Sequence, residues 1–130
     1  MTRTSRKANG APAFQFYVDD WISETELRLC DLGARGLWIE MLCIMWKSEK
    51  RGFLTLNGKP MSSKQLAKLV GEDEANVKLS LDTLLQNCVC GRDENGVIYS
   101  RRMAREEDVR LKRVEAGRKG GRASRREAKE

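Results

Sequence analysis

The chain has 130 residues, with 25 Lys or Arg against 19 Asp or Glu, so its formal net charge is +6. That length allows one small domain with terminal extensions. No histidine occurs, which excludes histidine general bases, histidine-ligated zinc and Ser-His-Asp triads. The longest uninterrupted apolar run, residues 41–46, is far below the roughly 20 residues of a membrane span, and the N-terminus lacks an apolar signal core. We therefore expect a cytoplasmic protein with no membrane contact.

The charge is distributed unevenly along the chain. Residues 1–12 carry three basic residues and no acidic one, and residues 101–130 carry 12 basic and six acidic residues. Residues 13–100 carry 10 basic and 13 acidic residues, so the middle is slightly negative. Basic ends attract polyanions through counterion release. The alternative is that charged ends only keep a small protein in solution.

The four cysteines are expected to be free thiols. Cys43 lies inside an apolar helical run and is predicted to be a small buried hydrophobe. Cys88 and Cys90 alternate around Val89, as neighbours in a strand would. With Cys30, this pattern lacks the paired spacing of a zinc site, so we expect no metal ion, no other cofactor and no disulfide.

An aromatic segment, residues 14–22, comes first and is expected to be an irregular arm that packs over the domain. From Asp31, a good N-cap, apolar residues recur at three- and four-residue steps and predict the central helix, which ends near residues 50–52. The residues of this stripe are Leu37, Trp38, Met41, Leu42, Met45 and Trp46.

Two shorter helices are predicted next, separated only by residues 71–73. Ser62 and Gln65 have the spacing of a capping box at the start of the first helix, and Asp73 caps the second. The apolar faces are Leu66, Leu69 and Val70 in the first helix, and Val77, Leu81, Leu84 and Leu85 in the second. Two such helices joined by a Gly-containing turn are typical of a helix-turn-helix.

Short strands are predicted on both sides of this helix pair. Residues 53–56 form one, closed by Asn57-Gly58, and residues 88–93 and 97–102 flank Asn95-Gly96, a strong signal for a hairpin with a type I′ turn. The order helix, strand, helix, helix, hairpin is that of a winged helix-turn-helix, in which the early strand pairs with the hairpin, or wing. The predicted fold class is therefore mainly α with a small β-hairpin (α+β).

Four segments follow from these patterns. We expect a disordered basic arm at residues 1–12, the winged helix-turn-helix domain at 13–103, an exposed charged helix at 104–116 and a disordered Gly/Arg-rich basic tail at 117–130. Opposite charges at i,i+4 support the exposed helix, and Gly117 marks its expected end.

Four runs combine core and turn residues in a recognisable order: residues 16–21, 36–46, 96–103 and 115–124. They resemble winged-helix domains of phage and prophage proteins of the replisome-organiser or replication-initiator type, and the similarity covers residues 14–124. The pattern contains no catalytic signature, so it implies a fold more directly than an activity. The resemblance implies a role in DNA replication or its control, in a bacterial cell or a phage-infected host.

The second helix of a helix-turn-helix normally enters the major groove of DNA. Here Asn76 has the chemistry to read adenine, Lys78 to reach a guanine or a phosphate, and Ser80 to add a base contact. The acidic residues 72–74 repel a polyanion at the same helix end. Packing against the core or a partner therefore remains open for this helix.

The predicted wing carries a second candidate surface. With Asn95-Gly96 as the two turn residues, Arg92 faces Tyr99, and strand alternation puts both on the outward face with Arg101. Arginine beside an aromatic residue suits phosphate contact or minor-groove insertion. The alternative is an ordinary strand tyrosine flanked by solvated arginines.

Further basic residues complete the candidate DNA-binding set. Lys64 and Lys68 share a helix face at i,i+4, and Arg118, Lys119 and Arg122 belong to the basic tail. A solvated helix face explains the two lysines equally well. The partner that these residues favour is double-stranded DNA.

We expect a DNA-binding protein of replication initiation or its control, with affinity from phosphate contacts of wing and tail and with strong salt dependence. The alternative is an adaptor or inhibitor that binds a replication or host protein, which the acidic middle and the aromatic arm motivate; that arm contains Phe14, Phe16, Tyr17 and Trp21. A transcription regulator is a variant of the first reading. No residue constellation supports catalysis, so we expect no enzyme.

Overall fold

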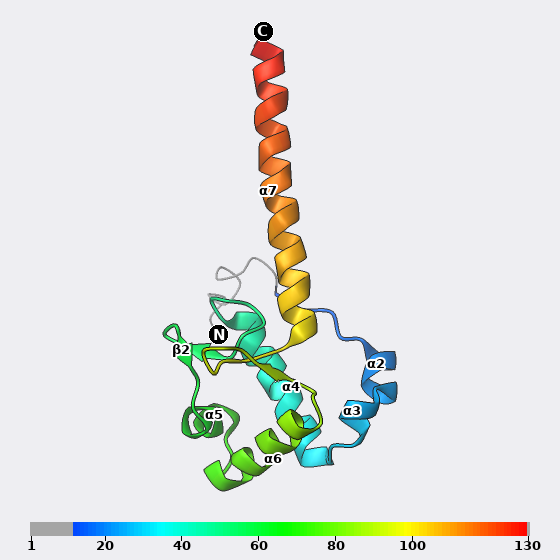
Figure 1. Cartoon of the computed structure of the whole chain (residues 1–130), viewed down its shortest axis with the longest axis vertical. Coiled ribbons are helices and arrows are strands. Elements are labelled where there is room, and N and C mark those ends of the chain that lie inside the picture. The colour runs from blue at the N-terminus through cyan, green and yellow to red at the C-terminus, as the bar shows by residue number, and fades with distance from the viewer. Residues whose placement is uncertain (1–11, 130) are drawn as a thin grey trace.

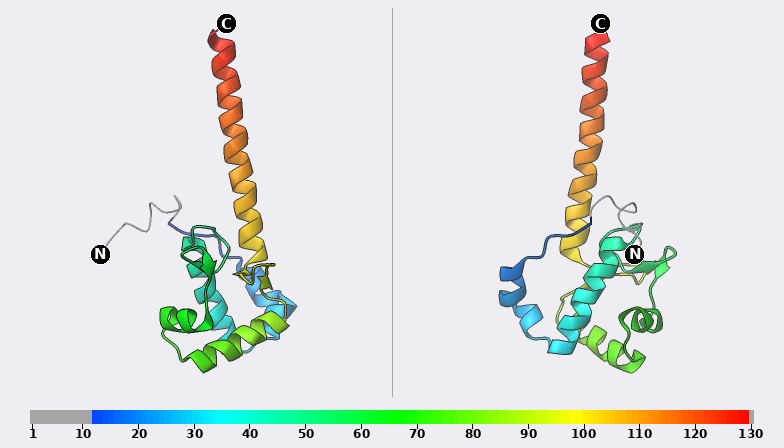
Figure 2. Two further views of the ribbon diagram at one scale, coloured as in Figure 1. Left: turned by 60° about the vertical axis from the view of Figure 1, so that its left-hand side comes forward. Right: turned by 180° about the vertical axis from the view of Figure 1, so that it is seen from behind.

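Helix α4, Leu32–Lys47, lies at the centre of the computed structural model, which describes the backbone of residues 12–129 and the side chains of residues 12–122. Over this range the chain is mainly helical with two small antiparallel strand pairs, so the predicted α+β class is confirmed. The other elements pack around α4, and the C-terminal helix projects from them as one rod (Figure 1, Figure 2). The predicted N-terminal basic arm lies, apart from Pro12, outside the described residues.

Helix α4 begins and faces the core as its sequence predicts. The Asp31 carboxylate accepts a hydrogen bond from the Ala34 amide at 2.9 Å, which caps the first turn. The buried residues recur at three- and four-residue steps: Ala34, Leu37, Trp38, Met41 and Met45. The helix ends at Lys47, earlier than predicted. Cys43 is exposed, so the predicted burial of this cysteine was wrong. Cys43 is two residues from both Met41 and Met45, a spacing that puts it on the opposite side of the helix from the core.

The aromatic arm that begins at residue 14 is partly helical, where the sequence predicts an irregular segment. It contains α2, Val18–Ser23, and α3, Thr25–Arg28. Two acidic residues in the first turn of α2 suit the positive end of its dipole. The Phe14 ring packs on the Trp46 ring with centroids 5.6 Å apart, and Trp21 packs against the core. The arm therefore lies over the domain as predicted.

Helices α5, Ser63–Val70, and α6, Glu74–Gln86, have the predicted bounds to within a residue or two. Both hydrogen bonds of the capping box are present, because the Ser62 hydroxyl accepts from the Gln65 amide at 3.1 Å and the Gln65 side chain accepts from the Ser62 amide at 3.0 Å. The α6 stripe is buried at Val77, Leu81 and Leu84. Leu69 is 58% exposed, contrary to prediction, because Ala67 takes the buried place beside Leu66.

The first strand pair is a small hairpin that the sequence predicts only in part. Strand β1, Thr55–Leu56, pairs with β2, Lys59–Pro60, around Asn57 and Gly58, which have φ of +53° and +76°. Positive φ at both central residues is the type I′ geometry that Asn-Gly favours. Strand β2 was not predicted, because a Pro within a run of residues argues against a strand. At the sheet edge, however, Pro60 is tolerated.

The second strand pair lies between α6 and the C-terminal helix. Strand β3, Gly91–Arg92, pairs with β4, Ile98–Tyr99. The segment before β1 lies beside β4, because the Leu54 amide donates to the Ile98 carbonyl at 2.8 Å and Phe53 forms a bridge with Tyr99. The predicted contact between the early strand and the hairpin is therefore present, although it is too short to form a regular three-stranded sheet.

The register of this hairpin differs from the prediction by one residue. Arg92 lies opposite Ile98, and Gly91 lies opposite Tyr99. The turn is a three-residue loop, in which the Asp93 carboxylate accepts hydrogen bonds from the amides of residues 95 and 97 and Gly96 has φ of +82°. The sequence suggests a two-residue type I′ turn, but the Asp93 side chain stabilises the longer loop.

Residues 88–90 are not strand, contrary to prediction. Cys88 has φ of +59° and follows the last turn of α6, where its amide donates to the Leu85 carbonyl and the Val89 amide donates to the Leu84 carbonyl. This is the hydrogen-bond pattern of a Schellman C-cap, here with cysteine in place of the usual glycine. The strand consequently begins only at Gly91.

The C-terminal helix α7, Arg101–Lys129, is one continuous helix of 29 residues. The sequence predicts a helix ending before Gly117 and a disordered tail at 117–130; the structure differs, because the helix continues across the glycines to Lys129. A helix anchored at one end needs no new nucleus, and the Ala, Arg, Lys and Glu residues of this segment offset the cost of three glycines. Over the described part of the chain, neither α7 nor any other helix is long and apolar enough for a transmembrane segment.

Candidate nucleic-acid interface

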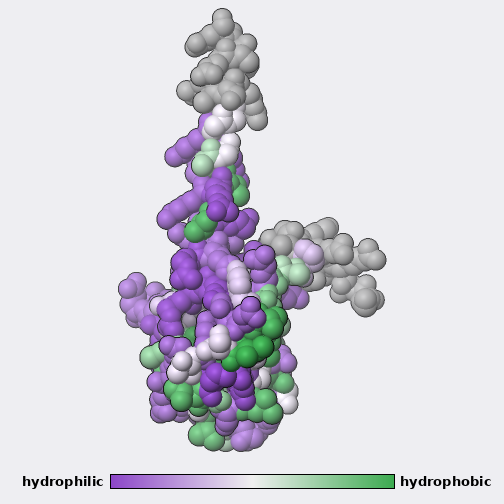
Figure 3. All heavy atoms as spheres, turned by 90° about the vertical axis from the view of Figure 1, so that its right-hand side faces the viewer, coloured by the Kyte–Doolittle hydropathy of each residue, from purple (hydrophilic) through white to green (hydrophobic). Residues whose placement is uncertain are grey.

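The distal part of α7 concentrates positive charge on an exposed helix. Arg118, Lys119 and Arg122 are exposed, and the sequence contains no acidic residue from position 117 to 126. Arg118 and Arg122 are one turn apart, and positions 125 and 126, both arginine, follow at the same helical spacing. We call Arg118, Lys119 and Arg122 the basic face of α7. The rod stands clear of the domain, and its visible surface is mostly hydrophilic (Figure 2, Figure 3).

Two of the predicted base-reading residues of α6 lie beside carboxylates of the same helix end, and the third is partly buried. The Asn76 amide nitrogen donates to the Glu72 carboxylate at 3.3 Å, and the Lys78 ammonium lies 3.9 Å from the Glu74 carboxylate. Ser80 is half-buried, at the helical spacing of the core stripe and close to α4 at Gly33. Ser80 is therefore a packing residue, and α6 does not present three free polar side chains to a DNA groove.

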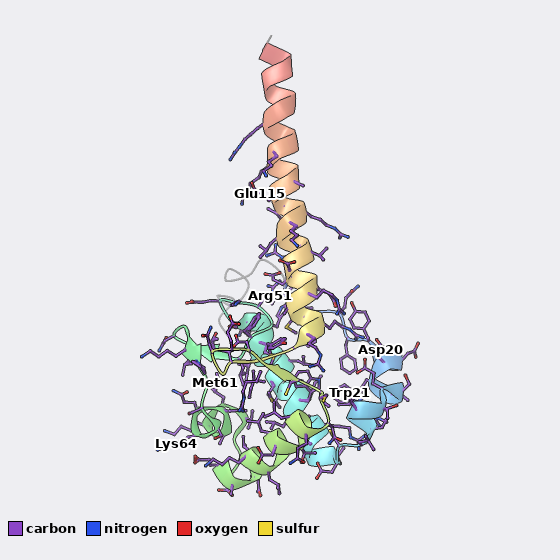
Figure 4. All side chains as sticks on the ribbon, viewed as in Figure 1. Asp20, Trp21, Arg51, Met61, Lys64 and Glu115 are labelled. Atoms are coloured by element: carbon purple, nitrogen blue, oxygen red, sulfur yellow. The ribbon has the colours of Figure 1, made fainter. Side chains whose placement is uncertain are left out.

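The lysines of α5 are placed as the sequence predicts. Lys64 and Lys68 are both exposed, one turn apart, and neither forms an ion pair with another described residue. Figure 4 shows Lys64 on α5, at the end of the molecule opposite to the tip of α7. These lysines and the basic face of α7 are consequently two separate surfaces.

The outward cluster predicted for the wing is not formed as expected. Arg92 is exposed, but the shifted register puts it opposite Ile98 instead of Tyr99. The Tyr99 ring lies over Gly91 and stacks on Phe53, with centroids 5.3 Å apart. Arg101 is exposed and begins α7, where its guanidinium donates to the Cys88 carbonyl. The structure thus leaves Arg92 and Arg101 exposed, while Tyr99 is half-buried as a strand aromatic.

A groove of about 500 Å³ lies between residues 13–24, the aromatic arm, and residues 101–110, which form the first turns, or root, of α7. We call it the root groove. Apolar residues from the arm, α3, α4, the loop before β3 and α7 line it: Ala13, Phe14, Phe16, Trp21, Leu27, Trp38, Leu42, Trp46, Val89 and Met103. Most of its charged residues belong to α7, and Asp20, Glu24 and Arg51 supply the others, so the root groove combines apolar and charged lining.

Two ion pairs, a cation–π contact and a hydrogen bond join the arm to the root of α7. The Arg102 guanidinium pairs with Asp20 and, at 3.4 Å, with Glu24, and it lies over the Tyr17 ring. The Tyr17 hydroxyl donates to the Glu106 carboxylate at 3.0 Å. That hydrogen bond is the main reason why the pKa of the Tyr17 phenol is raised. These contacts fix the direction in which α7 leaves the domain.

A second cluster joins α7 to the end of α4. Arg51, with a side chain only 2% exposed, lies 3.5 Å from Glu107 and stacks on the Trp46 ring at 3.6 Å. Arg110 pairs with the same carboxylate at 2.7 Å. The hydrogen bond from Arg110, followed by the positive charge of Arg51, lowers the pKa of Glu107, although burial opposes the shift. Burial lowers the pKa of the Arg51 guanidinium, and Glu107 opposes that change.

Sequence reasoning did not find the root groove or its ion pairs. Tyr17 and Glu106 are 89 positions apart, and Arg51 and Glu107 are 56 apart, so no local spacing connects them. The aromatic content of residues 14–21 was the one available signal. It indicates an apolar contact but not where that contact is made.

Nothing in the described residues indicates a metal centre, since no three His, Cys, Asp or Glu side chains lie close enough to hold an ion. No family model, curated protein or solved structure matches this chain. The function is therefore inferred from the geometry and charge of the basic face of α7 and of the root groove.

Proposed function

We propose that this chain binds double-stranded DNA, mainly through phosphate contacts of the basic face of α7. The observation that carries the proposal is the exposure of Arg118, Lys119 and Arg122 within a helical segment free of acidic residues. Continuous basic helices are known to contact DNA in the major groove, in proteins where two of them extend from a dimer. Its cations release counterions from the duplex, which supplies affinity that does not depend on base sequence.

We further propose that residues 13–103 form a winged helix-turn-helix. The order of α4, the segment before β1, α5, α6 and the β3–β4 hairpin supports this assignment, as does the bridge between Phe53 and Tyr99. The resemblance of the sequence to phage replication proteins makes DNA replication initiation, or its control, the setting that we favour. Lys64, Lys68 and Arg92 would provide additional phosphate contacts from the domain.

We expect little base readout from α6. Asn76 and Lys78 are each held by a neighbouring carboxylate, and Glu72, Asp73 and Glu74 surround the helix end that would approach phosphate. Like charges repel the DNA backbone there. The predicted behaviour is therefore strong salt dependence with modest sequence preference.

The test is fluorescence anisotropy with a labelled duplex of about 20 base pairs, which exceeds the roughly 43 Å length of α7. The double variant Arg118→Gln/Arg122→Gln removes two charges from the basic face, and we expect it to weaken binding about tenfold at low salt. The matched control is Arg28→Gln/Lys47→Gln, which removes two exposed charges from the domain. The control should bind within about twofold of the wild type. Equal affinity of the two double variants would refute the proposal.

A further inference from the structure

The root groove does not include any residue of the basic face of α7. We propose that it binds an acidic peptide segment of a protein partner. One large apolar side chain of the peptide would lie on the apolar lining, and its carboxylates would pair with Arg101 and Arg105. This inference does not depend on DNA binding by α7.

The size and apolar lining of the groove fit such a side chain. Its volume of about 500 Å³ is in the range of sites that enclose a ligand of a few hundred daltons. All three tryptophans of the chain line it, together with Phe14 and Leu42. Burying one large apolar side chain on such a surface is a typical anchor for a peptide.

The charges of the groove favour an anionic partner. Asp20 and Glu24 pair with Arg102, Glu106 accepts from Tyr17, and Glu107 pairs with Arg51 and Arg110. All four carboxylates that line the groove are therefore engaged.

Two arginines of the groove retain free donors. Arg105 is exposed and has no polar partner among the described residues, and Arg101 contacts only the Cys88 carbonyl. Each guanidinium carries five N–H donors and matches the geometry of a carboxylate. Five arginines line the groove against four carboxylates, so its net charge favours an acidic segment.

The state of the aromatic rings favours a peptide over a nucleic acid. Base stacking needs an open ring face. Arg51 covers one face of Trp46 at 3.6 Å while Phe14 packs against the same ring, and Arg102 lies over Tyr17 at 4.2 Å. The Phe16 and Trp21 rings pack on each other, with centroids 5.2 Å apart. Each of these rings therefore already has a cation or a second ring against it, which reduces the area that a base could stack on.

The experiment is a titration followed by tryptophan fluorescence, because every tryptophan lines the groove. The probe is the capped peptide Asp-Asp-Phe-Asp-Asp at about 150 mM salt, where exposed long-range charge is screened. We expect a saturable fluorescence change. The peptides Asn-Asn-Phe-Asn-Asn and Asp-Asp-Ala-Asp-Asp should each bind about tenfold more weakly, since each lacks one half of the recognition. No saturable change, or equal binding of the Asn peptide, would overturn the proposal.

Two matched variants locate the site. Arg105→Ala and Arg113→Ala each remove one exposed, unpaired arginine from α7, but only Arg105 lines the groove. We expect Arg105→Ala to weaken binding of the acidic peptide about fivefold, and Arg113→Ala and Arg118→Gln/Arg122→Gln to leave it unchanged. The same loss in both alanine variants would show that the peptide merely follows the charge of α7 and would overturn the site.

A final arm distinguishes the class of partner. In the Arg118→Gln/Arg122→Gln background, a single-stranded oligothymidine should not displace the peptide. Displacement that depends on Arg105 would place nucleic acid in the groove and refute the peptide assignment. Failure of DNA binding by the basic face would leave this result unaffected, so the two proposals fail separately.

Discussion

Gly52 determines how closely the root of α7 approaches the domain, and replacing it with alanine should destabilise the fold strongly. Its φ is +96°, and an added β-carbon would lie 2.7 Å from the Ala104 nitrogen and 2.9 Å from the Ala104 α-carbon. These are backbone atoms of α7, which cannot move aside as a side-chain tip can. The Ser100 amide also donates to the Gly52 carbonyl at 2.8 Å, so a shift would break this hydrogen bond.

The expected cost of Gly52→Ala has two parts. The backbone conformation costs a β-carbon about 1–2 kcal/mol, and forcing the contact with α7 adds about 1–3 kcal/mol. Together they lower the free energy of unfolding by about 2–5 kcal/mol, which lowers the Tm by roughly 8–40 °C for a domain of this size. Near-UV circular dichroism is the appropriate assay, because it follows the tryptophans of the domain and is insensitive to melting of the free part of α7.

The matched control is Gly58→Ala in the β1–β2 turn. Gly58 also has a positive φ, +76°, but an added β-carbon would meet no atom within 4 Å. Only the conformational cost applies there, about 1–2 kcal/mol. Equal Tm values for the two variants would refute the close packing of α7 on Gly52.

Two further predictions concern titratable groups. Arg110 and Arg51 lower the folded-state pKa of Glu107 below its ordinary value of 4.5. The ionised Glu107 side chain therefore stabilises the fold above pH 4.5, and this stabilisation is lost as the pH falls through the lower folded-state pKa. Urea unfolding should therefore find Glu107→Gln less stable than the wild type at neutral pH and equal to it in strong acid; an unchanged difference would contradict the ion-pair cluster. For the thiols, burial raises the pKa of Cys90 to about 11 and also raises that of Cys30, whereas Cys43 and Cys88 are exposed. A disulfide reagent at mildly alkaline pH should modify the two exposed cysteines quickly and the two buried ones only after unfolding; a single rate for all four would contradict this burial.

Local signals in the sequence were sufficient for α4, α5 and α6. The Asp31 cap, the capping box of Ser62 and Gln65, and the apolar stripes of α4 and α6 depend on residues within one or two turns of each other. Such signals predict where a helix begins and which side it buries. Asn95-Gly96 likewise indicated the β3–β4 hairpin, although not its turn type, and Asn57-Gly58 marked the end of β1.

Features that depend on distant contacts or on competing turn chemistry were not predictable. The carboxylate of Asp93 extends the β3–β4 loop by one residue, and that single change moves Arg92 away from Tyr99. Cys88 ends α6 with a positive φ that sequence rules assign to glycine. The root groove depends on pairs such as Arg102 and Asp20, 82 positions apart. Of the candidate site, sequence reasoning placed Lys64 and Lys68 on one helix face, but it did not predict the separation of Arg92 from Tyr99 or the root groove.

The most direct test of DNA binding by the basic face is the salt dependence of duplex affinity. Plots of log affinity against log salt between about 50 and 200 mM should be linear, with a slope set by the number of phosphate contacts. For Arg118→Gln/Arg122→Gln the slope should be smaller by about 2, so that its affinity falls about tenfold less than that of the wild type over this range. Arg28→Gln/Lys47→Gln should keep the wild-type slope. A slope that is the same in all three proteins would contradict the central claim that α7 holds the DNA.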